Sequence, residues 1–239
     1  MSSTIIALAA NKGGVGKTTI ALEVAYLLGG VLVDLDWDQG GASRAWGYDP
    51  EARARSQLLA ALNGSSKAPQ PVHGAGRPAL VPSHPLLSEV TIAPELLAEK
   101  LTSWAAAWPQ PYVVVDTHPG ATALSYGAMA AANLVVVPVV LGNRELDALG
   151  GMLAEFRTFR LLLIPNRVPA YPDARQIDRL DALASAYGVT VGPPILDHRW
   201  LPRRRHRTTL SSVKEPGERV ATAVGQFAAV VGAIKEQVT

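Results

Sequence analysis

The chain has 239 residues, a formal net charge of +2, 48% apolar residues and no cysteine. This length and apolar content suffice for one sizeable α/β domain, and the absence of cysteine excludes a disulfide framework, a cysteine nucleophile and thiolate-bound metal clusters. No apolar run approaches the roughly 20 residues that span a membrane, and the first run lacks the pattern of a secretory signal. We therefore expect a cytoplasmic protein in which any nucleic-acid surface depends on local clustering of charge.

A glycine-rich loop near the N-terminus joins a predicted strand to a predicted helix. The apolar run at 5–10 indicates a buried strand, and residues 20–28 have helical spacing. This arrangement is typical of a phosphate-binding loop, whose backbone N–H groups and helix N-terminus face the anion. Lys17 is expected to reach the β- and γ-phosphates, and the Thr18 hydroxyl to ligate Mg²⁺. The predicted nucleotide-binding residues of the loop are Gly13, Gly14, Val15, Gly16, Lys17, Thr18 and Thr19.

The segment from Lys12 to Thr19 resembles the deviant Walker A box of the ParA/MinD group of ATPases. It departs from the general phosphate-loop pattern because Asn11 or Lys12 stands where the first glycine belongs. The resemblance implies ATP and Mg²⁺ as cofactors. It also implies a role for Lys12, since the early lysine of that group reaches across a dimer interface to the partner's nucleotide. Lys12 and Lys17 are therefore expected to be catalytic residues.

A second buried strand is predicted at 31–36, and it ends in Asp34 and Asp36. The carboxyl ends of parallel strands line the ligand crevice, so both carboxylates should lie on the same edge as the phosphate loop. This segment, with the following Gln39-Gly40, resembles the D-x-D-P-Q-G box of ParA proteins. The resemblance implies that Asp36 positions the attacking water and helps to hold the magnesium shell.

One departure in this box leaves the catalytic aspartate open to a second interpretation. Trp37-Asp38 stands where the family has a single proline, so a shifted alignment would make Asp38 the catalytic residue. The apolar run at 31–33 fixes the strand register and favours Asp36. The alternative to both is a solvated acidic turn.

The middle of the chain is predicted to be mostly helical around one loop. Residues 42–62 favour helix with a break near 47–50, and residues 63–78, rich in Gly, Ser, Pro and Ala, predict a flexible surface loop. A short strand is predicted at 79–82. Residues 94–108 favour a helix whose tryptophans recur at helical spacing, which is more typical of a core than of a base-stacking platform.

Residues 112–116 form the clearest internal strand, and the strand ends in Asp116. An apolar run ending in Asp has the Walker B form, whose carboxylate binds Mg²⁺ near the loop threonine. The next residues resemble the family's D-T-P-P-G switch, with His118 replacing the first proline. Thr117 and Gly120 are thus expected to belong to a nucleotide-sensing loop, with the Gly120 amide near the γ-phosphate. His118 is interpreted as a turn residue, with a proton shuttle as the alternative.

The second half of the chain continues the alternation of strands and helices. Strands are predicted at 134–139 and 160–164, a helix opens near 144, and residues 173–187 are helical. The last strand is predicted at 189–191 together with 195–196. In relatives the residues after the 160–164 strand lie by the adenine, which implies nucleotide contacts for Asn166 and Arg167; a strand-end cap is the alternative.

A basic stretch at 199–207 and an amphipathic helix at 216–238 complete the sequence. Arginine binds phosphate through a planar fork of donors, and non-specific DNA binding is chiefly a phosphate term. In ParA relatives, basic residues of this region bind DNA, which implies a DNA-binding cluster. Its alternative is a solvated or acid-paired loop, or a contact to nucleotide or partner subunit. The cluster consists of Arg203, Arg204, Arg205 and Arg207.

Together these patterns predict an α/β fold with a mostly parallel sheet flanked by helices, forming one ParA-like ATPase domain over residues 1–239. The resemblance implies an ATP-dependent DNA partition ATPase. Its ATP-bound homodimer would bind non-specific double-stranded DNA on the nucleoid, and a ParB-like centromere-binding adaptor would stimulate its slow hydrolysis. A MinD-like membrane-cycling ATPase is the first alternative, although the small side chains of the C-terminal stripe favour packing on the body over stable membrane binding. A non-enzymatic DNA-binding scaffold is the second.

Overall fold

A computed structural model describes residues 3–38, 41–65, 67–204 and 207–239. Its centre is a seven-stranded sheet with the order β3-β2-β4-β1-β5-β6-β7. In the described ranges, each pairing between these strands is parallel, which confirms the predicted fold class. The strands are β1 Thr4–Leu8, β2 Val31–Asp34, β3 Ala79–Val81, β4 Tyr112–Asp116, β5 Leu134–Val139, β6 Leu161–Pro165 and β7 Thr190–Val191.

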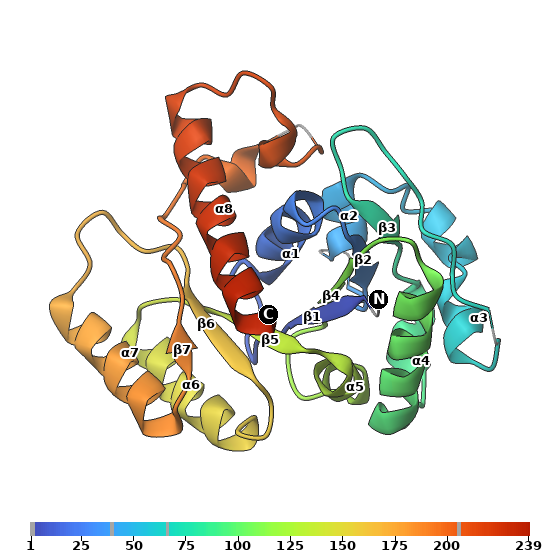
Figure 1. Ribbon diagram of the computed structural model, residues 1–239, viewed down its shortest axis with the longest axis horizontal. Coiled ribbons are helices and arrows are strands. Elements are labelled where there is room, and N and C mark those ends of the chain that lie inside the picture. Colours follow the sequence, from blue (N-terminus) through green and yellow to red (C-terminus); the bar gives the residue numbers. More distant parts are fainter. Residues whose placement is uncertain (1–2, 39–40, 66, 205–206) are drawn as a thin grey trace.

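Helices cover both faces of the sheet, because its strands are nearly continuous apolar runs that must be buried on both sides (Figure 1). One apolar cluster joins the sheet to α1, α2 and α8, and the other joins it to α3, α4, α5, α6 and α7. The α-helices are α1 Lys17–Leu27, α2 Ala42–Trp46, α3 Leu58–Leu62, α4 Pro94–Ala107, α5 Ala123–Ala131, α6 Asn143–Glu155, α7 Ala174–Tyr187 and α8 Glu218–Val238. Short 3₁₀ turns occur at η1 Ala52–Arg55, η2 Pro85–Glu89, η3 Leu201–Arg203 and η4 Leu210–Ser212.

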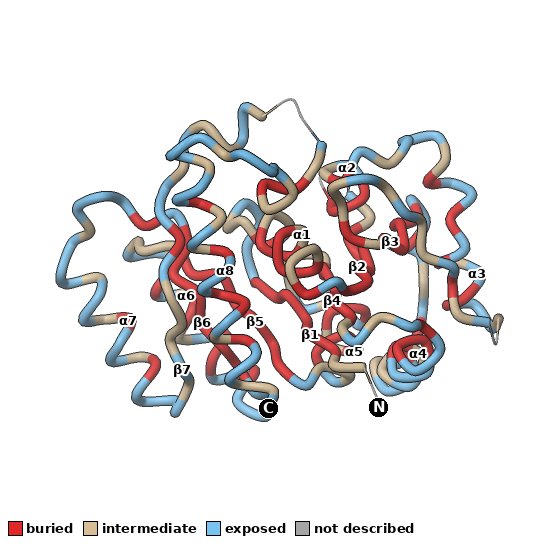
Figure 2. Tube along the Cα trace, turned by 45° about the horizontal axis from the view of Figure 1, so that its top comes forward, coloured by how far each residue is buried: buried red, intermediate tan, exposed pale blue. Residues whose placement is uncertain are grey.

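Burial follows this layering, since the strands and the inward faces of the helices are buried while the outer helix faces are exposed (Figure 2). Trp104 and Trp108 are buried in the cluster under α4, as expected for core residues. Along α8 the buried side chains are Ala223, Phe227, Val230, Val231 and Ile234, so this stripe packs on the body beside α1. No helix in the described ranges is long and apolar enough to cross a membrane.

The last predicted strand is shorter than its sequence pattern suggested. β7 ends at Val191, and the apolar pair Ile195-Leu196 does not continue it. The intervening Pro193-Pro194 lacks backbone N–H donors, so a regular ladder cannot be maintained. Leu196 forms only an isolated parallel bridge with Val168.

The segment 63–78 contains no helix or strand within its described residues. It is nevertheless hydrogen-bonded to the body at several backbone groups, two of which are carbonyls that accept from tryptophans. Trp108 Nε1 donates to the carbonyl of Pro69 at 3.1 Å, and Trp46 Nε1 donates to that of Pro78 at 2.8 Å. Buried tryptophans usually require such a partner for the indole N–H, so these bonds anchor the segment beside β3.

Candidate nucleotide-binding site

The glycine-rich loop lies between β1 and the first turn of α1, as its sequence predicts. Gly14 and Gly16 adopt positive φ angles of 79° and 93°, a conformation that favours glycine. A Cβ at Gly16 would also lie 2.2 Å from Asn166 Nδ2, so a larger residue would collide with the end of β6. The loop encloses a cavity of about 370 Å³ lined by residues 12–19 together with Asp36, Asp38, Pro119 and Arg167.

Lys17 and Thr18 line this cavity, and both contact Asp116, which lies behind the lining. Lys17 Nζ lies 3.0 Å from Asp116 Oδ1 and also contacts the Thr117 carbonyl, and Thr18 Oγ1 donates to Asp116 Oδ2 at 2.7 Å. Burial raises the pKa of the Asp116 carboxyl, while Lys17 and the Thr18 hydroxyl act against that rise. A hydroxyl and a carboxylate beside a phosphate cradle are the oxygen ligands that Mg²⁺ prefers, so Thr18 and Asp116 fit a magnesium site.

Asp34, at the end of β2, is fully buried and has its own set of donors. Its Oδ2 accepts hydrogen bonds from Ser43 N at 2.6 Å and Ser43 Oγ at 2.5 Å, and its Oδ1 accepts one from Asp36 N at 3.0 Å. Burial, reinforced by the nearby Asp116 carboxylate, raises the pKa of Asp34 to about 7. Asp34 thus fixes the turn after β2 and the start of α2, and it does not line the phosphate cavity.

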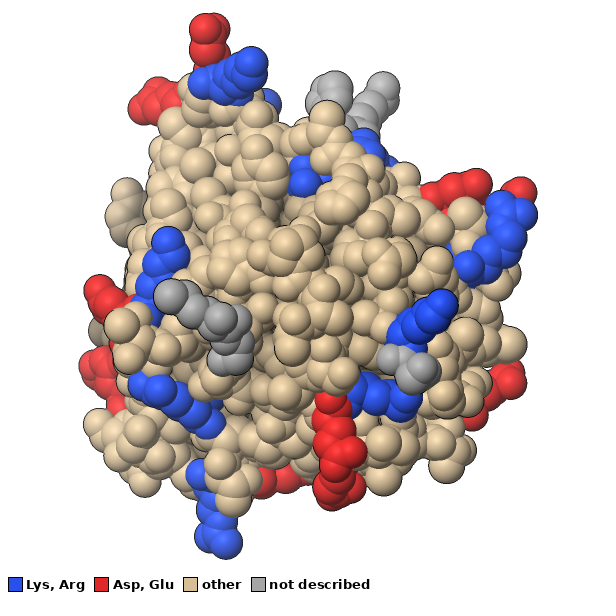
Figure 3. Space-filling view, turned by 45° about the vertical axis from the view of Figure 1, so that its right-hand side comes forward, with Lys and Arg blue, Asp and Glu red and all other residues tan. Residues whose placement is uncertain are grey.

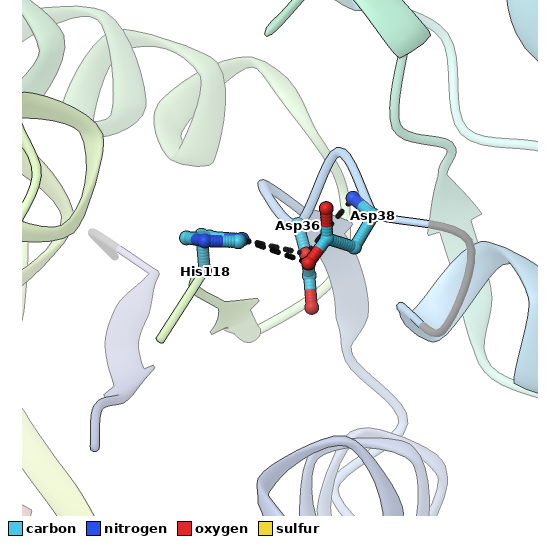
Figure 4. A group of neighbouring side chains, drawn as sticks. All are labelled: Asp36, Asp38 and His118. Atoms are coloured by element: carbon cyan, nitrogen blue, oxygen red, sulfur yellow. Dashed lines mark hydrogen bonds and ion pairs between the residues drawn. The ribbon is translucent and has the colours of Figure 1, made fainter. Parts of the chain in front are cut away.

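Asp36 and Asp38, the two candidates for the catalytic aspartate, differ in burial and in contacts. The Asp36 side chain is 10% exposed and its Oδ1 lies 2.9 Å from His118 Nδ1, whereas the Asp38 side chain is 66% exposed and its Oδ2 lies 3.9 Å from that nitrogen (Figure 4). Asp38 N donates to Asp36 Oδ1 at 3.1 Å. Both residues line the phosphate cavity, but Asp36 is the one held in place by a side chain.

Three further residues shape this turn, and of these only Trp37 stands out in the sequence, as a departure from the aspartate box. Trp37 stacks on the His118 ring with centroids 3.8 Å apart and an angle of 14° between the planes. Buried Arg53, from η1, donates to the Trp37 carbonyl at 3.0 Å, and Ser83 Oγ donates to the Asp36 carbonyl at 2.7 Å. Arg53 Nη2 also lies 3.3 Å from Ser83 Oγ. Arg53 follows α2 and Ser83 follows β3, so only tertiary folding brings them to the turn after β2.

Lys12, at the opposite end of the loop, lies against the start of α6. Its Nζ is 3.9 Å from Glu145 Oε1 and 3.5 Å from the Arg144 carbonyl. The side chain is 48% exposed. Within a single subunit, Lys12 is therefore paired with α6, and it remains accessible to a second molecule.

The two residues of the predicted switch are bonded to the end of β1. Thr117 Oγ1 donates to the Leu8 carbonyl at 2.8 Å, and Gly120 N donates to the Ala10 carbonyl at 3.0 Å. Gly120 has a φ of 97°, a conformation strained for any residue with a Cβ. The switch segment therefore joins the ends of β4 and β1 beside the phosphate loop.

Asn166 and Arg167 lie between the phosphate loop and a second cavity of about 460 Å³. Asn166 Nδ2 donates to the Val15 carbonyl at 2.7 Å, so its amide braces the loop. Arg167 lines both cavities and has a φ of 55°. The far wall of the second cavity includes Arg199 and Arg203 of the basic stretch.

The arginines of the basic stretch face different surroundings. Arg203 and Arg207 are exposed, whereas Arg204 is partly buried, its pKa is lowered by that burial, and it donates to the Thr208 carbonyl at 3.2 Å. Arg205 lies outside the described residues. Arg204 and Arg207 line a third cavity, of about 300 Å³, together with Arg77. On the face drawn in Figure 3, basic and acidic side chains are interspersed rather than gathered into one field.

A buried carboxylate connects α1 to the segment that follows the arginines. Glu23 is 3% exposed and accepts hydrogen bonds from Leu210 N at 2.5 Å, Ser211 N at 3.0 Å and Ser211 Oγ at 2.7 Å. The helix that starts at the phosphate loop is therefore joined directly to η4. Glu23 lies within a helical pattern in the sequence, and nothing there distinguishes it from a surface glutamate.

The chain is similar in sequence to known proteins. A family model described as an AAA domain matches residues 3–166. The chromosome-partitioning ATPase Soj of Thermus thermophilus is 35% identical over 174 residues, which are 67% of this chain and 64% of that protein. The chain thus covers less than two thirds of the length of this relative.

Solved structures share the fold at low sequence identity. A complex of ATP with a variant of McdA from Cyanothece superimposes with a TM-score of 0.75 at 18% identity, covering 99% of this chain and 96% of that one. The cell division protein MinD of Aquifex aeolicus gives a TM-score of 0.76 at 15% identity, covering 98% of this chain and 97% of that one.

Proposed function

This chain belongs to the ParA-type P-loop ATPases, and from that premise we propose that it is an ATP-hydrolysing DNA partition ATPase. The observation that carries the proposal is the phosphate cavity, in which Lys12, Lys17, Thr18, Asp36 and residues of the glycine-rich loop line one space. Phosphoryl transfer to water needs positioning and charge stabilisation rather than a covalent intermediate, and these residue types provide both.

Lys17 is the residue assigned to neutralise the β- and γ-phosphates. Its present partner is the buried Asp116 carboxylate, 3.0 Å away, so nucleotide binding requires Lys17 to turn from Asp116 towards the phosphates. Thr18 and Asp116 would hold Mg²⁺, whose charge stabilises the negative charge that develops on the transferred phosphoryl group. Asp116 would then exchange one cationic partner for another and would not be left buried without one.

Asp36 is assigned to orient the attacking water, and Asn166 and Arg167 to border the nucleotide. Lys12 is assigned to the partner's phosphates in an ATP-bound homodimer. Its contact with Glu145 is partly exposed and 3.9 Å long, and exposed ion pairs of this kind contribute little stability, so dimer formation can displace it at low cost. On this proposal the loop of each subunit completes the site of the other.

The exposed arginines are assigned to the phosphates of non-specific double-stranded DNA, which would place the dimer on the nucleoid. Slow hydrolysis, stimulated by a ParB-like centromere-binding adaptor, would release it. The named relative Soj is a chromosome-partitioning ATPase, which supports this cellular role. The bond between Glu23 and η4 supplies a physical connection from the nucleotide helix to the arginine stretch.

The proposal is tested by measuring DNA binding and ATP turnover in the same preparation. We expect binding to a non-specific duplex with ATP and Mg²⁺, and much weaker binding with ADP or without nucleotide. Asp36→Ala should bind DNA in ATP and keep only a residual rate of turnover, whereas Asp38→Ala should bind DNA and turn over ATP. DNA binding that is independent of nucleotide would contradict the switch, and turnover retained in Asp36→Ala but lost in Asp38→Ala would reverse the assignment.

A MinD-like membrane cycle is the alternative, supported by the shared fold with MinD. It requires an apolar helix face that is free to enter a bilayer. In α8 the large apolar side chains Phe227 and Ile234 are buried against the body. We therefore expect no ATP-dependent pelleting with anionic liposomes, and pelleting that is abolished by deleting residues 218–239 would favour the alternative.

A further inference from the structure

The two positions at which the sequence departs from the family's aspartate box and switch are in contact with each other. Trp37 occupies the place of the proline in the D-x-D-P-Q-G box, and His118 replaces the first proline of the D-T-P-P-G switch. Their rings stack at 3.8 Å with an angle of 14°. They follow different strands, β2 and β4, so this contact joins two motifs that are separate in the sequence.

His118 also contacts Asp36, and the chemistry of the carboxylate fixes the direction of the bond. The distance from His118 Nδ1 to Asp36 Oδ1 is 2.9 Å. An ionised carboxylate can only accept, so Nδ1 must carry the hydrogen and donate it. A proline ring offers no such donor. Histidine at this position therefore adds a directional bond to the carboxylate that the family's residue could not make.

Hydrogen bonds from other segments of the chain fix the backbone of Asp36 and Trp37. Arg53 and Ser83 donate to the carbonyls of Trp37 and Asp36, and Asp34 accepts the Asp36 N–H. Because these bonds fix the backbone and the His118 imidazole binds the carboxylate, the Asp36 side chain has little freedom to rotate. The carboxylate of Asp38, two residues further on, lies 3.9 Å from His118 Nδ1 and is mostly exposed.

We propose that His118, supported by the stacked Trp37, is a positioning residue that holds the Asp36 carboxylate in the orientation needed to align the attacking water. This inference rests on the proposed ATPase function. It also explains why the extra residue in the aspartate box is tolerated: the stack of Trp37 on His118 keeps the longer turn in place. Correct alignment of a reacting group contributes strongly to rate, so losing it lowers kcat more than it changes nucleotide affinity.

The test compares His118→Ala, His118→Asn and Trp37→Leu with the native chain, in ATPase assays with Mg²⁺ and duplex DNA. We expect His118→Ala to lower kcat about tenfold or more while KM for ATP changes less than about twofold. His118→Asn, whose amide can replace the Nδ1 donor, should recover most of the rate, and Trp37→Leu should fall between the two. The exposed His73 provides the matched control, His73→Ala, which should not change kcat.

Coupling to Asp36 separates positioning from a general loss of structure. In an Asp36→Ala background, His118→Ala should cause no further loss of rate, because the group it orients is gone. A native kcat in His118→Ala, a full further loss in the double variant, or no rescue by asparagine would each overturn the inference. If the native chain does not hydrolyse ATP, the proposed function fails and the inference fails with it. Normal hydrolysis with an unaffected His118→Ala removes the inference alone.

A cation held by the same side chains is the competing explanation. Ligand atoms of Asp36, Asp38 and His118 lie within 4.8 Å of one another, a spacing that a divalent ion can bridge. Positioning predicts that His118→Ala lowers kcat by the same factor in Mg²⁺ alone and with added Mn²⁺ or Zn²⁺, because no second cation takes part. Metal ligation predicts that Asp38→Asn is as damaging as His118→Ala and that Mn²⁺ or Zn²⁺ stimulates only the native chain. That pair of results would overturn the positioning role.

Discussion

The carboxylate edge of the sheet and the basic stretch carry comparable numbers of charges but hold them in opposite ways. At the ends of β2 and β4, Asp34, Asp36 and Asp116 are buried, and each has partners within about 3 Å. In the basic stretch, Arg203 and Arg207 are exposed, although the Arg207 guanidinium also donates to the Arg44 carbonyl. The difference matches the tasks assigned to them, since hydrolysis depends on orientation in a desolvated site and non-specific DNA binding depends mainly on the number of cations.

The largest expected effect comes from removing the positive charge of Lys17, which lies beside the carboxylate edge. Lys17→Gln should weaken ATP binding at least about 100-fold, because the phosphates lose their main charge partner in a buried site. Glutamine can still donate to Asp116, so the fold should survive. A fluorescent ATP analogue titrated into the variant measures the loss, with exposed Lys235→Gln as the control. If the variant binds ATP within threefold of the native affinity, Lys17 is not the main charge partner of the phosphates, and the contrast between the two regions fails.

The next effect tests whether the two regions are mechanically joined. Glu23→Gln places an NH₂ group opposite donors that now bond a carboxylate, and an unsatisfied buried group costs about 1–3 kcal/mol. We expect the free energy of unfolding in urea to fall by about 2 kcal/mol and ATP-dependent DNA binding to weaken as well. The exposed Glu89→Gln provides the control. If stability falls while DNA binding stays unchanged, the bond between Glu23 and η4 does not couple α1 to the arginine stretch.

The basic stretch should respond in a graded way. Arg203→Ala combined with Arg207→Ala should lower DNA affinity about tenfold at moderate salt and reduce the slope of log K against log salt by about 2. The exposed pair Arg157 and Arg175, on the α6 and α7 side, gives a control with the same change of charge. ATP turnover without DNA should not change. Equal losses in the control pair would mean that net charge, rather than this stretch, determines DNA binding.

The last prediction concerns the pH dependence of the free energy of unfolding that Asp34 contributes. Its pKa rises from an ordinary value of 3.8 to about 7 in the folded chain, so folding favours the protonated form. Stability from this group is therefore full below about pH 4 and is lost as pH rises through about 7. Asp34→Asn should flatten this decline in urea unfolding between pH 5 and pH 8, whereas exposed Asp178→Asn should leave it unchanged.

The parts of the site that sequence could predict are those in which spacing dictates position. Lys17 and Thr18 follow a glycine-rich loop directly after a strand, and Asp116 ends an apolar run, so all three had to reach the same sheet edge. The fold class followed from the alternation of apolar strands and helices. Arg53, Ser83 and Glu23 could not be identified, because their partners lie in segments brought near only by tertiary packing. The contact of Trp37 with His118 was equally hidden, although both positions stood out as departures from motifs.

The strand order has a consequence for how the chain is made. β1 lies between β4 and β5, so Thr4 pairs with Tyr112 and Ile6 with Leu134. During translation β1 must therefore stay unpaired until β4 has left the ribosome, and pairings across so many residues are slow to form and leave strand edges prone to aggregation. Lys17 and Asp116 are 99 residues apart, so ATP cannot assist the earliest stages. On the proposed function, ATP would bind only once the middle of the sheet has closed.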